Sequence, residues 1–190
     1  MPIWYFFLAP WLAAPVFYLA GEAVSNAFHW VVTYERTGSK GTLLTSLQFI
    51  AEQGQGRTGK LAPVADYRMH GYGLVMLWAM LLASRPAALW RKLFLGTGVM
   101  LFIAASGVTL QWLNDIFNRS GPHVLAQTRA SAVLAEAVEF GFHFNLFVFT
   151  ALAPLLLWVV MNRAFVQALW NDAIKAPAPA GQSDETGQAD

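Results

Sequence analysis

Three ionisable residues, Glu136, Glu139 and His143, have side chains and a spacing that could carry out chemistry. They stand at positions i, i+3 and i+7, so a helix would place all three on one face. Two carboxylates beside an imidazole could bind a metal ion or pass a proton. A di-iron bundle is excluded, because it needs Glu-x-x-His motifs on two helices and the sequence contains none. A single-metal site remains open, completed by a neighbouring Asp115, His123 or His70.

The simpler interpretation of the same three residues is that they lie at a membrane boundary and bond to neighbouring helices and water. A haem site is another alternative, since His29 and His143 come from different predicted helices and histidine is a common haem ligand. Haem ligands usually lie deep inside a bundle, whereas these two histidines fall near the ends of their predicted helices. The sequence therefore predicts no bound cofactor.

Glu22 is a further candidate, because a carboxylate in an apolar helix is a functional hypothesis by default. An ion pair with one of three arginines is the alternative, namely Arg68, Arg119 or Arg129. We expect Glu22, Arg68 and Asp115 to make contacts with a partner or with other polar groups of the chain.

The elements that must position these residues are apolar helices. Four runs contain no Asp, Glu, Lys or Arg, at residues 3–21, 69–84, 93–114 and 140–162. A bilayer core of about 30 Å is crossed by about 20 apolar residues in a helix. The chain is also 56% apolar, which exceeds the share in ordinary soluble domains. The sequence predicts an all-α membrane protein with about four transmembrane helices, at residues 3–24, 70–88, 93–117 and 138–162.

One sizeable polar segment, residues 33–69, separates the first two predicted spans. Two β-prone runs, 42–50 and 58–64, flank a glycine-rich connection, a pattern typical of a β-hairpin. Pro63 should end the second strand or confine it to an edge. We therefore expect a single membrane domain over residues 1–170, with an exterior loop at 33–69 that can form a hairpin. Residues 176–190 have the composition of a disordered tail.

The distribution of basic residues predicts the orientation, because Lys and Arg near span ends favour the cytoplasm. Arg85, Arg91 and Lys92 lie between the second and third predicted spans, and Arg163 and Lys175 follow the fourth. Both termini are then cytoplasmic, and the 33–69 loop lies outside. The net charge of +1 argues against nucleic-acid binding. The chain has no cysteine, which excludes disulfides and a cysteine nucleophile in it.

Several short motifs resemble a known family of membrane proteins. They are Trp4-Tyr5-Phe6-Phe7-Leu8-Ala9-Pro10, Gly71-Tyr72-Gly73-Leu74, Gly107-Val108-Thr109-Leu110-Gln111-Trp112-Leu113, Leu152-Ala153-Pro154-Leu155 and Asn162-Arg163-Ala164-Phe165. Over residues 1–170 the chain resembles the small proteins encoded beside exosortases, especially the exosortase H-associated type. The resemblance implies a bacterial inner-membrane accessory of a system that sorts exported proteins. The exosortase itself is a cysteine transpeptidase, so its catalytic residues do not transfer to this cysteine-free chain.

Two functions follow as hypotheses. The first is a non-catalytic accessory protein in the lipid bilayer that presents or stabilises the exosortase or its sorted substrate, with the hairpin edge available for strand addition. The second is a membrane enzyme or redox subunit with a metal or haem site near Glu136, Glu139 and His143. A transporter is a weaker third, because transporters usually carry internal repeats and we find none in the sequence.

Overall fold

Helices form most of the computed structural model, which describes residues 8–50, 58–86 and 88–175. The α-helices are α1 (Ala9–Ala27), α2 (Tyr67–Ser84), α3 (Leu89–Asn114), α4 (Pro122–Thr128), α5 (Ala132–Phe144), α6 (Thr150–Met161) and α7 (Arg163–Lys175). Two π-helical turns, η2 (Asp115–Arg119) and η3 (Asn145–Phe149), continue α3 and join α5 to α6. The strands are β1 (Val31–Thr37), β2 (Lys40–Thr45), β3 (Gln48–Ile50), β4 (Thr58–Lys60) and β5 (Val64–Asp66).

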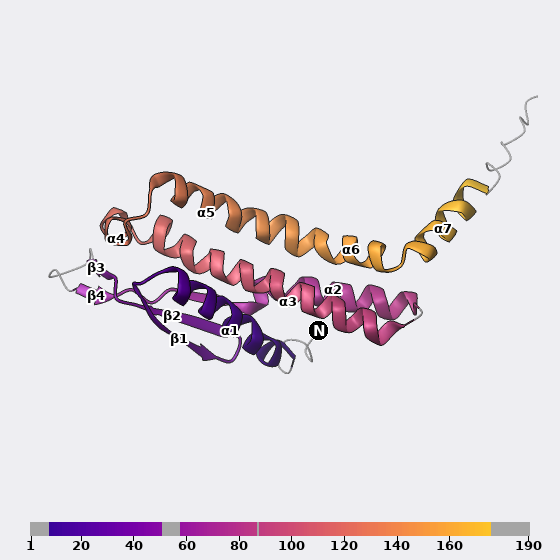
Figure 1. Cartoon of the computed structure of the whole chain (residues 1–190), viewed down its shortest axis with the longest axis horizontal. Coiled ribbons are helices and arrows are strands. Elements are labelled where there is room, and N and C mark those ends of the chain that lie inside the picture. The colour runs from indigo at the N-terminus through magenta and orange to yellow at the C-terminus, as the bar shows by residue number, and fades with distance from the viewer. Residues whose placement is uncertain (1–7, 51–57, 87, 176–190) are drawn as a thin grey trace, which may run out of the picture.

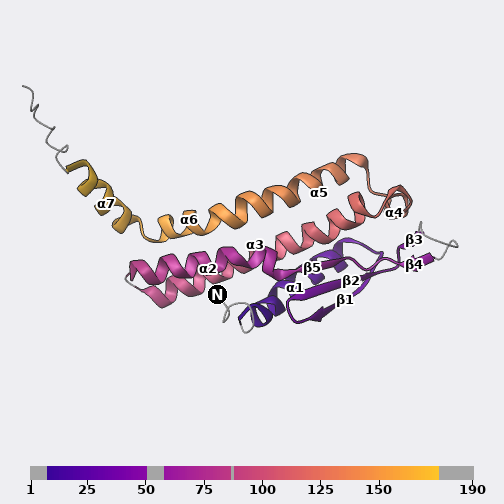
Figure 2. The same ribbon diagram turned by 180° about the vertical axis from the view of Figure 1, so that it is seen from behind.

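Helix α3 is the axis on which the other elements pack. In Figure 1 it runs along the long axis of the molecule, beside the continuous helix formed by α5, η3 and α6. Figure 2 shows from behind that α2 accompanies one half of α3, while α1 and the strands accompany the other half. The helix α2 contacts α3 and α6, and α1 contacts α3 and β1. The fold therefore consists of two units built on one helix.

The polar segment after α1 forms two small antiparallel sheets, one with the order β1-β2-β5 and one of β3 and β4. The predicted hairpin is present as β3 and β4, which are shorter than expected; its connection at residues 51–57 lies outside the described residues. The larger hairpin of β1 and β2 was not predicted from the sequence. Gly38 closes this hairpin with φ of 63°, which suits the first central position of a type II′ turn.

The first unit, which we call the outer unit, comprises α1, the strands and the last turns of α3. Its core lies where α1 and the sheet meet α3. One face of α1 is buried, comprising Ala9, Ala13, Val16, Phe17, Ala20, Gly21 and Val24. Trp112 of α3 is fully buried and donates its Nε1–H to the carbonyl of Gly41 over 3.2 Å. Its ring centroid lies 5.8 Å from that of Phe17. A single tryptophan thus connects the helix, the central strand and α1.

The other unit packs α2 closely against α3 and α6 around Leu74, Leu77, Leu81, Met100 and Ala153. Pro154 has no backbone N–H, so the carbonyl of Thr150 loses its helical partner. This carbonyl faces Gly73, where an added Cβ would lie only 2.5 Å from the oxygen. The glycine therefore allows α2 to approach α6 at the point where the helix hydrogen bond is missing.

Two continuous helices in the described part of the chain are long and apolar enough to cross a membrane. They are Leu89–Arg119 and Ala132–Met161, with 33% and 17% of their most apolar windows buried. The core helix of a soluble protein would be mostly buried, whereas these two expose apolar side chains along their length. Of the four predicted crossings, these two have the length and hydropathy that a transmembrane helix needs. The predicted tail at 176–190 lies outside the described residues, and α7 extends beyond the expected domain end at residue 170 to Lys175.

We predict that Gly73→Ala lowers the free energy of unfolding by about 1–3 kcal/mol, because the new methyl group must displace the Thr150 backbone. Thermal unfolding in detergent would measure this as a lower midpoint temperature. The matched control is Gly98→Ala on α3, where no atom lies within 4 Å of the added Cβ. Equal stability of the two variants would contradict the close approach of α2 and α6.

Candidate functional site

The three residues predicted to share a helix face do lie on α5, but on its exposed surface. Glu136 and Glu139 are exposed, and His143 follows one turn later. The Nδ1 of His143 lies 2.8 Å from the carbonyl of Glu139, so this nitrogen carries the hydrogen and donates it. The ring of His143 stacks on Phe147 with centroids 6.2 Å apart. The imidazole is thus held by its own helix.

The metal hypothesis requires at least three suitable side chains within reach of one ion. Within residues 8–50, 58–86 and 88–175, no group of three His, Cys, Asp or Glu side chains is arranged to hold a metal. The Glu136, Glu139 and His143 face therefore stays a prediction from the sequence.

The other candidate residues are placed apart from one another. Glu22 is exposed on α1. The pKa of the Tyr34 hydroxyl lies above its ordinary value, mainly because burial removes water from the hydroxyl and also because the charge of Glu22 acts on it. Arg119, one proposed partner of Glu22, instead bonds Asp115 with an Nη1 to Oδ1 distance of 3.1 Å. Arg68 lies at the start of α2, where its backbone N–H donates to the capping carboxylate of Asp66. These residues do not form one site.

A buried polar cluster, absent from our predictions, lies where α2, α3 and η3 meet. His70 is 1% exposed, and its Nε2 lies 3.0 Å from Oε1 of Gln111. The ring of His70 packs edge-on against Phe142. Asn145 is 3% exposed and opens the π-helical turn. We call His70, Gln111 and Asn145 the polar junction.

The π-helical turn positions Asn145 toward α3. Its Nδ2 donates to Oγ of Ser106 over 2.9 Å and approaches the carbonyl of Ile103 at 3.5 Å. The carbonyl of Asn145 accepts both the backbone N–H of Thr150 and, over 3.0 Å, its hydroxyl. Such π-bulges often mark functional positions. Here the bulge turns an amide inward between three helices.

Gly107 leaves room for two members of the junction, His70 and Asn145, to approach α3. An added Cβ at this position would lie 2.5 Å from Nδ1 of His70 and 2.6 Å from Oδ1 of Asn145. Both of these atoms are buried without a hydrogen-bond partner. Helix α2 and the turn η3 thus bring Nδ1 of His70 and Oδ1 of Asn145 to the same point above Gly107, and neither atom forms a hydrogen bond with a described residue.

Reasoning from the sequence missed this junction because it favoured charged side chains. The sequence offered His70 only as a possible additional ligand of a metal site. The available signal was that Gln111 and Asn145 are uncharged polar residues inside runs otherwise dominated by apolar ones. Polar side chains in such helices usually face the bundle interior and pair with one another.

We predict that Gln111→Leu lowers the free energy of unfolding by about 1–3 kcal/mol, because it leaves the buried His70 ring without its partner. The double variant His70→Leu/Gln111→Leu should cost less than the two single changes together, since both polar groups are then gone. Chemical or thermal unfolding of the three variants completes the cycle. Strictly additive losses would contradict a coupled pair.

The sequence is similar to a known protein family over most of its length. The family model described as exosortase H-associated membrane protein matches residues 1–165. Searches of curated proteins and of solved structures found no significant match. The family match covers all but the last part of the chain and includes every residue of the polar junction. The chain therefore belongs to the family of exosortase H-associated membrane proteins.

Proposed function

We propose that the protein is a non-catalytic accessory of an exosortase-type sorting system in a bacterial inner membrane. It would present or stabilise the transpeptidase or its sorted substrate. The observation that carries this proposal is the family match over residues 1–165. The absence of cysteine from the chain supports the non-catalytic role, because the reaction of the system requires a cysteine nucleophile that this protein cannot supply.

The packing of α1 supports three membrane crossings rather than the four that the sequence suggested. Strand β1 runs back along α1, and Nη1 of Arg36 donates to the carbonyl of Pro10 over 3.0 Å near the helix start. Glu35 and Arg36 are exposed on this strand. Open sheet edges do not occur in hydrocarbon, since their backbone groups would lack partners. A helix beside such a strand belongs outside the bilayer, which leaves α3 and α5–η3–α6 to cross. We place α2, which packs against both of them, as the third crossing.

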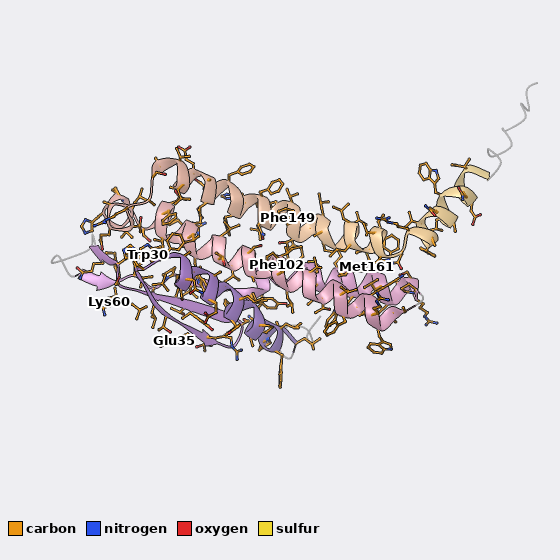
Figure 3. All side chains as sticks on the ribbon, in the orientation of Figure 1. Trp30, Glu35, Lys60, Phe102, Phe149 and Met161 are labelled. Atoms are coloured by element: carbon orange, nitrogen blue, oxygen red, sulfur yellow. The ribbon has the colours of Figure 1, made fainter. Side chains whose placement is uncertain are left out.

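The basic residues in the short connection between α2 and α3 and at the start of α7 support one orientation. Arg85, Arg91, Lys92 and Arg163 lie at the end where α2 meets α3 and α6 meets α7. Lys92 Nζ donates to Oδ1 of Asn162 over 2.9 Å, which joins α3 to α6 at this end. Basic residues favour the cytoplasmic side. In Figure 3, Lys60 and Glu35 lie far from Met161, on the sheet side of the molecule. The sheet and α1 would then face the periplasm, and α7 the cytoplasm.

This arrangement changes the earlier expectation that both termini are cytoplasmic, because three crossings put α1 and α7 on opposite sides. It also gives the accessory a display function. The outer unit is carried on the extended end of α3, so its sheet stands at a fixed height above the membrane surface. A partner with its reactive region near that surface would meet the sheet first.

Strand β1 is the part of the sheet best suited to bind an extended segment of a partner. It has seven residues and lies at one edge of the order β1-β2-β5. Val32 is 66% exposed and lies at a register irregularity of the strand. An extended peptide could add to such an edge through main-chain hydrogen bonds. The exposed charges of Glu35 and Arg36 limit pairing between two copies of the chain.

We predict that the tagged full chain, extracted from native membranes in mild detergent, recovers an exosortase or a sorted protein identified by mass spectrometry. The Val32→Asp variant should reduce this recovery by about tenfold, equivalent to about 1.4 kcal/mol, because it places a charge at the binding edge. The matched control is Val64→Asp on the opposite edge strand β5, which should retain recovery.

The two parts of this test fail separately. If the unaltered chain recovers no component of a sorting system, the accessory role is wrong. If it does so, but Val32→Asp and Val64→Asp recover the partner equally, the role stands and binding at the β1 edge is wrong.

Three crossings predict a specific labelling pattern, and the chain is convenient for it because it contains no cysteine. Tyr18 of α1 is 58% exposed, and Tyr18→Cys should react with a membrane-impermeant maleimide on intact spheroplasts. His123→Cys of α4 should behave likewise. Leu156→Cys should stay unreactive in lipid, and Asn171→Cys should react only after permeabilisation. Protection of Tyr18→Cys under both conditions would favour α1 as a fourth crossing.

A further inference from the structure

The polar junction contains two buried atoms that face the same point and cannot satisfy each other while a neutral ring keeps its hydrogen on Nε2. They are Nδ1 of His70 and Oδ1 of Asn145, both without a hydrogen-bond partner. Both lie within hydrogen-bonding range of the position that a side chain on Gly107 would occupy, at 2.5 and 2.6 Å. Their separation is therefore no more than the sum of these two distances. An arrangement of this kind calls for a hydrogen between them.

The orientation of the Asn145 amide follows from its other contacts. Its Nδ2 contacts the hydroxyl of Ser106 at 2.9 Å and the carbonyl of Ile103 at 3.5 Å. Ser106 donates its one hydrogen to that same carbonyl over 2.7 Å, so its oxygen can only accept from Asn145. A reversed amide would direct an oxygen at two acceptors. Oδ1 of Asn145 is therefore the atom that faces His70, and it can only accept.

The other side of the imidazole also meets an amide oxygen. Nε2 of His70 lies 3.0 Å from Oε1 of Gln111, so Nε2–H donates in this orientation. In a neutral ring Nδ1 then carries a lone pair, which faces the acceptor Oδ1 of Asn145. A buried pair of this kind is destabilising, because neither group recovers the hydrogen bond that it made to water. A doubly protonated ring instead has a donor on each nitrogen. Its Nε2–H keeps the bond to Gln111, and its Nδ1–H reaches Oδ1 of Asn145 after a small movement of either side chain, since these two atoms form no hydrogen bond as they stand.

We propose that His70, Gln111 and Asn145 form a buried proton-binding site in which the imidazolium of His70 donates Nε2–H to Gln111 and Nδ1–H to Asn145. The ligand is a proton taken from water, and no other bond forms or breaks. Because the three residues come from α2, α3 and η3, the bound proton would join three helices through two charge-assisted hydrogen bonds, which are stronger than neutral ones.

Charged groups on the surrounding helices act on this site in opposite directions. Burial of the ring opposes its charge, while the carboxylate of Asp66, which caps α2 four residues earlier, favours it. Phe142 contributes an apolar edge from α5. The other titratable or charged side chains on the helices packed here are Tyr67, Arg68 and Tyr72 of α2, Tyr18 and Glu22 of α1, Arg91 and Lys92 of α3, Asp115 next to α3, and Glu136, Glu139 and His143 of α5. The balance is therefore open to direct measurement.

The experiment observes the two ring nitrogens of His70 directly. The chain has four histidines, and the other three, His29, His123 and His143, are exposed. The variant His29→Gln/His123→Gln/His143→Gln therefore leaves His70 as the single histidine. It is labelled with nitrogen-15 histidine, placed in lipid nanodiscs, and examined by magnetic resonance between about pH 5 and pH 8, the range in which histidine changes charge.

We expect both nitrogens of His70 to carry hydrogen over part of this range and to lose one with a defined midpoint. In the same background, Asn145→Asp should raise that midpoint by about one to three pH units, since it replaces a neutral acceptor by a carboxylate. Asn145→Leu has a similar volume and removes the acceptor, so it should lower the midpoint. The three midpoints together test the role of Asn145 apart from its packing.

Two other occupancies of the junction would overturn the proposal. One is a neutral ring with Nδ1 bare throughout the range, which corresponds to a bridging water molecule. The other is a neutral ring with hydrogen on Nδ1 and none on Nε2, which requires Gln111 to turn its amide group. An unchanged midpoint in Asn145→Asp and Asn145→Leu would also overturn it, because Asn145 would then not contact the proton. Circular dichroism of each variant confirms that the helices are retained.

Discussion

The structure depends on one helix that is longer than a bilayer core is thick. Leu89–Arg119 contains 31 residues and is about 46 Å long at 1.5 Å per residue, against a hydrocarbon core of about 30 Å. The surplus length must leave the membrane, and it needs partners where it does. Trp112 supplies them by binding Gly41 and packing on Phe17. The proposed position of the sheet above the membrane rests on this surplus.

Close helix contact in the other half depends on small residues and on polar groups that find partners. Gly73 leaves room for the carbonyl of Thr150, which loses its helical hydrogen bond because of Pro154. Gly107 leaves room for His70 and Asn145. In a membrane the apolar surfaces of helices gain little by leaving lipid, so packing and internal hydrogen bonds decide which helices meet. The polar junction is therefore both a structural contact and the place where the bundle is most sensitive to a change in hydrogen bonding.

An accessory role places particular demands on such a fold. A protein that presents a partner needs a rigid support and an accessible surface, and it needs no reactive centre of its own. In the proposed role, continuous helices would supply the support, and the seven residues of β1 at a sheet edge would supply the surface. Membership of the exosortase H-associated family is consistent with these demands. The exposed Glu136, Glu139 and His143 on α5 lie on a different element from this edge.

The sequence by itself determined the apolar helices, because a run without charges has few alternatives to a helix in lipid. It also indicated the family, the turn residues and the hairpin of β3 and β4. Tertiary structure alone decided that β1 follows α1, since Val31–Thr37 becomes a strand through pairing with β2 and strand propensity depends on its neighbours. It likewise decided the polar junction. His70, Gln111 and Asn145 are far apart in the sequence, and only the packing of three helices around Gly107 brings their side chains together.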